Sequence, residues 1–323
     1  MPAPLVQVVR SGVVESVHLG DIAVCDASGR VVASTGDPDR VTFARSCMKP
    51  IQGAVSIAAI DVPMSDADIA IVCSSHNGEP VHVRAVRRVL RRTGVGLDAL
   101  QNPPGRPMDE ESAVRVARPA PVYQDCSGNH AGILGASVRA GWPVASYRSR
   151  GHPHHRRVLP LVRSLAGADP VVGVDGCGIP VHGLPLRALA TMYARMAAGF
   201  GAAYDEEIGR VTAAMRAEPY LVGGRDRDDT ELMTAAQDLV VKEGAEALTC
   251  AVSLDACIGV AVKVHDGGYR AAGPAMITVL SELGLLAAGA RRRLRPRLRP
   301  VVRGGGRPVG HLEPILTLTS HRA

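Results

Sequence analysis

Short runs of valine, isoleucine, leucine and alanine stand near both ends of the chain, and residues that favour turns follow them. These runs constrain the fold most, because short apolar runs rich in β-branched residues and bounded by turn signals predict β-strands. The expected strands cover residues 4–9, 22–25, 31–34, 239–242 and 259–264. The sequence Asp-Ala-Ser-Gly at 26–29 separates two of them and is typical of a hairpin turn.

The middle of the chain has a helical period instead. From Ser46 to Ala59, apolar residues recur about every 3.6 positions, which predicts a helix. Similar patterns predict helices over 81–92, 131–140, 186–198, 205–217 and 274–288, and short buried strands at 69–73 and 171–174. Antiparallel strands at both ends with helices between them predict an α+β fold, a sandwich of antiparallel sheet and helices. No repeat or linker divides the chain, so we expect one domain over residues 1–323, or two closely packed lobes.

Several classes of protein are disfavoured by what the sequence lacks. It has no apolar run of about 18 residues or more, so we expect no membrane-spanning helix and no membrane partner. The start, Met-Pro-Ala-Pro, lacks the basic and apolar regions of a secretory signal, which predicts a cytoplasmic protein. Seven cysteines are an odd number, and in that compartment metal binding or burial is a better expectation than disulfide bonds.

The basic residues are almost all arginine. Lysine and arginine total 37, yet lysine occurs only at Lys49, Lys242 and Lys263. Arginine keeps its proton in proteins, whereas a buried lysine can become a neutral amine. These three lysines are therefore candidates for a chemical role.

A basic run covers residues 291–307, with eight arginines and no acidic residue. Such a run can indicate nucleic-acid binding, but a solvated helix and loop give the same composition. Almost no aromatic residue lies nearby to stack on a base, as single-strand binders need. We expect no nucleic-acid partner.

Three short motifs use two of the lysines. Ser46 and Lys49 form a Ser-x-x-Lys at a helix start, where a neutral amine can take the hydroxyl proton. Ser75 begins Ser-His-Asn, and Lys242 begins Lys-Glu-Gly. The order resembles that of the motifs in serine β-lactamases and penicillin-binding proteins, although the spacing differs. Alternatively, Ser46 is a helix cap, Ser75 a turn residue and Lys242 an edge-strand charge.

Cys126, Asp175 and Cys177 form a second candidate site. Two thiolates and a carboxylate leave a fourth position open, the pattern of a catalytic zinc ion. Buried cysteines are more often plain small apolar residues, the role expected for the other strand cysteines. The histidines at 152–155 could also bind metal, but a solvent-exposed loop is the preferred interpretation there.

Taken together, several segments resemble one bacterial family, the zinc-containing, thermolabile asparaginase II-type enzymes. The similar segments are residues 9–18, 45–52, 75–79, 126–132, 175–178 and 242–246, and the resemblance runs from about residue 6 to about residue 314. It implies a fold related to serine β-lactamases and glutaminases, a homodimer, and hydrolysis of L-asparagine to L-aspartate and ammonia.

The resemblance also implies roles for individual residues. Its serine–lysine pairs are Ser46 with Lys49, and Ser75 with a second lysine. Lys242 is the choice for that lysine and Lys263 the alternative. Its zinc ligands are Cys126, Asp175 and Cys177. Arg45 and His130 are candidate substrate contacts, and zinc is expected to orient the substrate. Two positions depart from the family pattern, Asn129 in place of lysine and Ala247 in place of glycine.

Two other functions stay open at this point. One is a penicillin-binding or β-lactamase-like acyl hydrolase that acts on another amide. The other is a non-enzymatic, basic nucleic-acid-binding protein, whose binding should fall steeply with salt. The sequence decides neither which serine is the nucleophile nor whether asparagine or glutamine is preferred.

Overall fold

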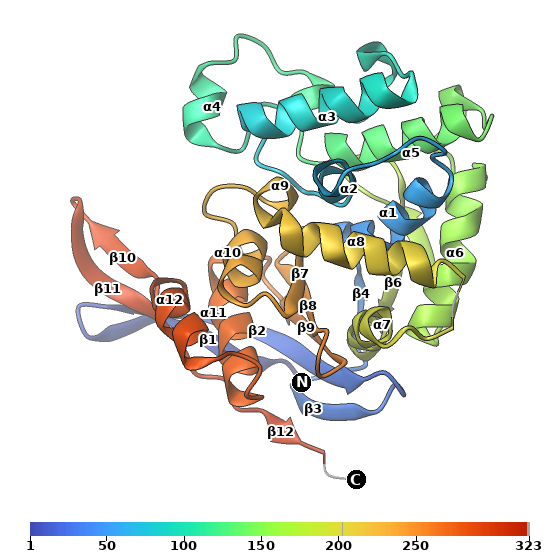
Figure 1. Ribbon diagram of the computed structural model, residues 1–323. Helices are drawn as coiled ribbons and strands as arrows, with labels where there is room; N and C mark the ends of the chain where they lie inside the picture. The colour runs from blue at the N-terminus through green and yellow to red at the C-terminus, as the bar shows by residue number, and fades with distance from the viewer. Residues whose placement is uncertain (202, 322–323) are drawn as a thin grey trace.

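The computed structural model describes residues 1–201 and 203–321 and is built around an antiparallel sheet (Figure 1). Its strands follow the order β10-β11-β1-β2-β9-β8-β7, with β3 on β2 and β12 on β3. The strands are β1 (Ala3–Arg10), β2 (Val13–Asp26), β3 (Val31–Thr35), β7 (Leu239–Gly244), β8 (Leu248–Ser253), β9 (Ile258–Val264), β10 (Val301–Gly304), β11 (Arg307–Pro314) and β12 (Thr319–Ser320). The two ends of the chain thus meet in one sheet, as the apolar runs predict.

A second, three-stranded sheet has the order β4-β6-β5, again antiparallel. Its strands are β4 (Val41–Phe43), β5 (Val171–Val174) and β6 (Pro180–Pro185). The turn between β5 and β6 holds Asp175 and Cys177. Strand β4 leads directly into the helix start at Ser46. This small sheet therefore places the β5–β6 turn near Ser46.

Most helices cover one face of the large sheet and form a helical layer, while α11 and α12 lie on the other side (Figure 1). The helices are α1 (Lys49–Ala58), α2 (Asp66–Val72), α3 (Pro80–Thr93), α4 (Glu110–Val114), α5 (Ser127–Arg139), α6 (Pro153–Ala166), α7 (Leu186–Ala198), α8 (Asp205–Ala217), α9 (Pro219–Val222), α10 (Asp228–Ala235), α11 (Tyr269–Glu282) and α12 (Ala288–Leu298), with 3₁₀ turns η1 (Arg45–Met48), η2 (Leu97–Ala99), η3 (Pro121–Tyr123) and η4 (Val144–Ser146). Helix α7 packs on β2, β8 and β9. The predicted α+β sandwich is confirmed.

One predicted strand is wrong. Residues 69–73 belong to α2 and its C-terminal cap, and the chain enters this helix through a capping box in which Ser65 and Asp68 bond each other's backbone N–H groups. A short, fully buried apolar run has the same composition in a helix and in a strand, so periodicity cannot separate them. The capping box is the signal that decides.

The solvent-exposed loop predicted at 152–155 is also wrong. Pro153 is the first residue of α6, and His154 and His155 are buried on its inner face. Proline is common at this helix position because it has no N–H to satisfy there. The basic run does form a largely exposed helix, α12. In residues 1–201 and 203–321, no helix is long and apolar enough to span a bilayer.

Candidate active site

A cavity of about 400 Å³ opens where the helical layer meets the end of β7. Ser46 and Ser75 both line it, although they come from different parts of the chain. The other lining residues are Met108, Asp125, Asp226, Arg227, Asp228, Glu243, Gly244, Ala245, Tyr269, Arg270 and Arg297. Polar and charged groups therefore surround two buried hydroxyl groups.

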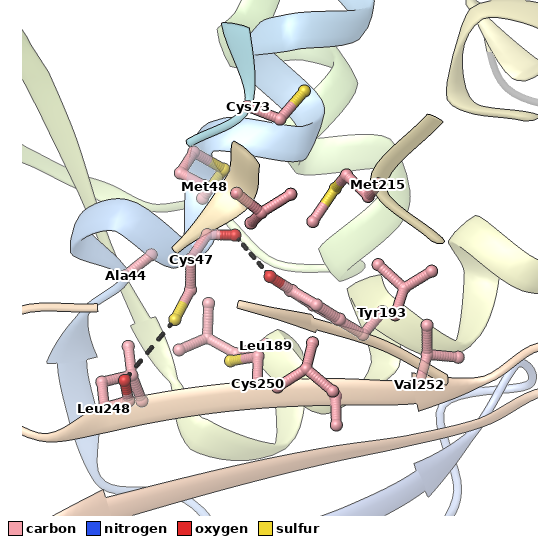
Figure 2. Packing of buried hydrophobic residues seen from close by; sticks show 14 of the residues in the cluster. Ala44, Cys47, Met48, Cys73, Leu189, Tyr193, Met215, Leu248, Cys250 and Val252 are labelled. Atoms are coloured by element: carbon pink, nitrogen blue, oxygen red, sulfur yellow. Dashed lines mark hydrogen bonds between the residues drawn. The ribbon is translucent and has the colours of Figure 1, made fainter. Parts of the chain in front are cut away.

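The position of Ser46 is fixed by its neighbour Cys47. The Cys47 thiol donates to Lys242 O at 3.1 Å, and Tyr193 Oη donates to Cys47 O at 2.8 Å. Figure 2 shows Cys47 and Tyr193 packed among buried apolar side chains. Gly244 permits the close approach of β7, because a Cβ there would lie 3.0 Å from Cys47 Sγ. The core thus holds η1 so that Ser46 faces the cavity.

The lysine that contacts Ser75 is Lys49, not Lys242. Its Nζ donates to Ser75 Oγ at 2.8 Å and to Ser74 O at 2.6 Å, and the side chain is buried. Burial alone lowers the pKa of Lys49, but the negative charges of Cys126 and Asp125 outweigh it, so the pKa is raised. The resting amine is therefore protonated and bonded to one of the two cavity serines.

The predicted pair of Ser75 with Lys242 forms no hydrogen bond among the described residues. Lys242 is fully buried, and its Nζ donates to Asp229 Oδ2 and to Glu243 O, both at 2.9 Å. A buried ammonium group needs a carboxylate partner, and Asp229 is fully buried as well. Lys263, the alternative, donates to Val264 O at 2.7 Å and does not line the cavity.

The three proposed zinc ligands come together only in part. The neighbouring Cys177 thiol, together with the charge of Lys49, lowers the pKa of Cys126 although burial opposes this. The carboxylate of Asp175 instead accepts from Arg45 Nε at 2.7 Å. In the part of the chain that the structure describes, no group of three or more metal-binding side chains is close enough to hold an ion. Two soft donors fit zinc, but the third is engaged elsewhere.

Neither predicted substrate contact lines the cavity. Arg45 has a positive φ of 47° at the start of η1 and forms its ion pair with Asp175. His130 is fully buried on α5, where its Nδ1 lies 2.7 Å from Tyr147 Oη. Arg45 thus bonds Asp175, and His130 bonds Tyr147 through Nδ1 while its Nε2 is buried without a partner among the described residues.

Arg227 and Glu243 are cavity residues that sequence reasoning missed. Arg227 Nε donates to Glu243 Oε2 at 2.6 Å, and Arg227 Nη1 donates to Ser75 O at 3.2 Å. This pair joins the start of α10 to β7 beside Ser75. Glu243 stands inside the Lys-Glu-Gly motif, which could have drawn attention to it. Arg227 is one arginine among many, so its sequence context carries no signal.

Asp228 follows Arg227 and adds a titratable group to the cavity. Burial and the nearby Glu243 charge raise its pKa to about 7. Its backbone N–H donates to Glu243 Oε1 at 3.2 Å, and Arg297 Nη1 lies 3.6 Å from its Oδ1. The charge of the cavity therefore changes near neutral pH.

Comparison with known proteins gives one family match. The family model described as L-asparaginase II matches residues 6–314, and no curated protein matches the chain. Among solved structures, Mglu is 16% identical with a TM-score of 0.48, covering 83% of this chain and 67% of that one. A second Mglu structure is 19% identical, with a TM-score of 0.47 and coverage of 83% and 61%.

Two further solved structures have lower scores. A Bacillus glutaminase is 11% identical over 83% of this chain and 91% of that one, with a TM-score of 0.45. A β-lactamase from Mycobacterium bovis is 15% identical over 81% and 94%, with a TM-score of 0.37. These scores are too low to support an argument about chemistry, so that argument depends on the family match and on the cavity itself.

Proposed function

Because the chain belongs to the L-asparaginase II family, we propose that it is an amide hydrolase that converts L-asparagine to L-aspartate and ammonia. The observation that carries the proposal is the cavity that both Ser46 and Ser75 line, where the buried Lys49 bonds Ser75. A hydroxyl group next to an amine is the arrangement that serine–lysine acyl transfer requires.

Ser46 is the proposed nucleophile. The N–H of Ser75 already donates to Val222 O at 3.0 Å, so it is not free to stabilise an oxyanion. Ser46 lies in the first turn of η1, where Cys47 N–H donates to Ala44 O but Ser46 N–H has no acceptor among the described residues. One such donor aimed at the developing oxyanion typically lowers the activation free energy by ~3 kcal/mol.

Lys49 and Ser75 move the proton in this mechanism. Ser46 Oγ bonds to the side-chain amide carbon, and its proton passes through neutral Lys49 and Ser75 to the departing ammonia. Water then cleaves the ester by the reverse proton path and frees L-aspartate. The resting cavity favours the ammonium form of Lys49, so the base is the minor, neutral form, which burial keeps accessible.

In this proposal Lys242 has an indirect, structural role and does not contact Ser75. Its ion pair with Asp229 fixes the end of β7 against α10. That end supplies Glu243 and Gly244 to the cavity wall. A change at Lys242 is thus expected to act through stability and wall geometry.

The charged wall suits a free amino acid. Asparagine carries an ammonium and a carboxylate group, and the wall offers both carboxylates and guanidinium groups. Arg227 and Arg270 are the proposed carboxylate contacts, since an arginine fork matches a carboxylate. Asp125 and Asp228 are the proposed ammonium contacts.

Asp228 leads to a prediction about pH. Its folded pKa is about 7, so it gains its negative charge as pH rises through neutrality. We expect kcat/KM for L-asparagine to rise over that interval, because the charged carboxylate attracts the substrate ammonium. In Asp228→Asn the rise should be lost and KM should increase. If Asp228→Asn had the same pH profile as the wild type, the proposed role of Asp228 in binding the ammonium group would be rejected.

The proposed reaction is tested with a panel of amides. Ammonia release should be greatest with L-asparagine, lower with L-glutamine, and reduced to background in Ser46→Ala. A β-lactam is the third arm, and its hydrolysis in place of both amides would favour the penicillin-binding-like alternative. No turnover of any amide above the Ser46→Ala background would reject an amide hydrolase.

Zinc and the homodimer are further proposals, supported by the converging thiols of Cys126 and Cys177 and by the family resemblance. Metal analysis should find about one zinc ion per chain that Cys177→Ser loses. The Asp175 carboxylate would have to leave Arg45 to become a ligand. Retention of zinc in Cys177→Ser would reject these ligands, and light scattering that finds only monomers would reject the dimer.

A further inference from the structure

The arginines that line the cavity of the proposed active site differ in what their guanidinium groups already bind. Both Nη groups of Arg297 donate to Asp226, one to its backbone oxygen and one to its carboxylate, each at 2.8 Å. Arg227 donates to protein groups through Nε and Nη1. Arg270 bonds through Nε, and neither of its Nη groups has a partner among the described residues. Arg270 is therefore the cavity arginine whose Nη edge is free to receive a carboxylate.

The partner of Arg270 is a buried histidine on β2. Arg270 Nε donates to His18 Nε2 at 3.0 Å, and His18 is 6% exposed. A guanidinium group only donates, so Nε2 must be the accepting nitrogen of the ring. The proton of the neutral ring therefore stands on Nδ1.

Asp266 binds the ring from its other side. His18 Nδ1 donates to Asp266 Oδ2 at 2.6 Å, and the N–H of Gly268 donates to Oδ1 at 2.8 Å. Partial burial raises the pKa of Asp266, but these bonds and the nearby positive charges outweigh it, so the pKa is lowered and the carboxylate is charged. Each donor in the series from Arg270 through His18 to Asp266 thus meets an acceptor.

The loop before α11 is also tied to β2 independently of the His18 side chain. The N–H of His265 donates to Leu19 O at 2.9 Å, and the His265 ring bonds the buried Asp21. Gly268 lies close to the His18 ring, because a Cβ there would be 2.9 Å from Cε1 of that ring. A smaller side chain at position 18 should therefore leave the loop in place and change what Arg270 bonds.

We propose that His18 is a positioning residue for substrate binding, which holds Arg270 through Nε so that its free Nη groups receive the α-carboxylate of the amino acid. His18 itself does not touch the substrate. Arg270 is exposed, and a long side chain fixed before binding loses less conformational entropy when the substrate arrives. The inference rests on the proposed function, because it takes an amino acid as the substrate.

A matched pair of substitutions at His18 tests this role. Asparagine places its amide near the position of Nδ1 and can still bond Asp266, but it offers no acceptor to Arg270. Glutamine reaches the position of Nε2 and can accept from Arg270. We expect His18→Asn to raise KM for L-asparagine about tenfold with kcat within about twofold of the wild type, because ground-state and transition-state binding weaken equally. His18→Gln should bring KM back to within about threefold of the wild type.

His311→Asn is the control, since this histidine lies on β11 of the same sheet and does not line the cavity. It should have wild-type kinetics. Arg270→Gln should raise KM at least as much as His18→Asn, and the double variant should be no worse than Arg270→Gln alone, because His18 acts through Arg270. A further rise in the double variant, an equally high KM in His18→Gln, or a loss of kcat at unchanged KM would each overturn the proposal.

Nitrogen NMR of the histidine rings tests the contact without turnover. Above neutral pH, the His18 ring should carry its proton on Nδ1, and its Nε2 signal should shift in Arg270→Gln; loss of the signals in His18→Gln assigns them. A proton on Nε2, or an Nε2 signal unchanged in Arg270→Gln, would overturn the positioning role. Absence of ammonia release by the wild type would instead reject the proposed reaction, so the two failures are distinguished.

Discussion

Replacing Lys49 by arginine is expected to lower turnover of L-asparagine by a factor of about 100 or more, the usual scale of general acid–base catalysis. Arginine keeps the positive charge and much of the length but cannot give up its proton. The hydrogen bond of 2.8 Å to Ser75 makes Lys49 the only one of the three lysines that contacts a serine lining the cavity within the described residues. Steady-state ammonia release with purified protein measures the effect.

Lys263→Arg is the matched control for that change. Lys263 is half-buried and bonds only backbone carbonyls outside the cavity, so its replacement should leave turnover near normal. Circular dichroism should show that both variants fold. Near-normal turnover in Lys49→Arg would mean that the amine is a structural cation. A dead Lys263→Arg beside an active Lys49→Arg would contradict the assignment more strongly.

Replacing Lys242 by methionine is expected to destabilise the fold by about 3–5 kcal/mol, the usual cost of removing one partner of a buried ion pair. The loss arises because Asp229 is then buried without a counter-ion. Urea unfolding measures the free energy of unfolding. Lys263→Met should have a much smaller effect, since its side chain lies partly in solvent.

A double variant separates the ion pair from other roles of Lys242. If the unpaired carboxylate causes the loss, Lys242→Met with Asp229→Leu should recover most of the stability, because well-packed apolar residues often replace such pairs without cost. A double variant no more stable than Lys242→Met alone would show that the lysine is needed for another reason. Activity that stays low in a restored double variant would support a direct catalytic role for Lys242.

The sequence predicted the sheet and most helices because their apolar patterns are long enough to show a period. Strands β1, β3, β7 and β9 and helices α3, α7 and α8 fall where the patterns place them, whereas the strand predicted at 22–25 is only the last part of β2. Residues 69–73 were misassigned because a buried run of this length has no readable period. Strand β8 was missed although β7 is equally buried, because its sequence, Leu-Thr-Cys-Ala-Val-Ser, has only two large apolar residues.

The site was predicted less completely, for a different physical reason. The sequence motifs identified Ser46 and Ser75, which line one cavity, and Lys49, which bonds Ser75. Which lysine lies beside which serine depends on tertiary contacts, so the motifs alone do not give it. Lys49 follows a 3₁₀ turn rather than sharing one α-helical face with Ser46, and Lys242 has its counter-ion in α10. No local pattern reveals such partners.

The electrostatic surroundings were the hardest part to anticipate. Arg227 approaches Ser75 only because α10 packs against β7, a contact between segments that the sequence does not link. The histidines of α6 were assigned to a loop because polar side chains suggest exposure. In the fold they are buried, and one ring nitrogen each of His155 and His154 bonds Tyr147 O and Ser56 Oγ.

The central claim is that Ser46 forms a covalent ester with the substrate and that Lys49 and Ser75 carry its proton. Acid quenching during turnover of L-asparagine, followed by peptide mass spectrometry, tests this most directly. The account predicts an aspartyl ester on Ser46 that is absent in Ser46→Ala and reduced in Lys49→Arg. An ester on Ser75, or continued ammonia release by Ser46→Ala without any ester, would contradict it.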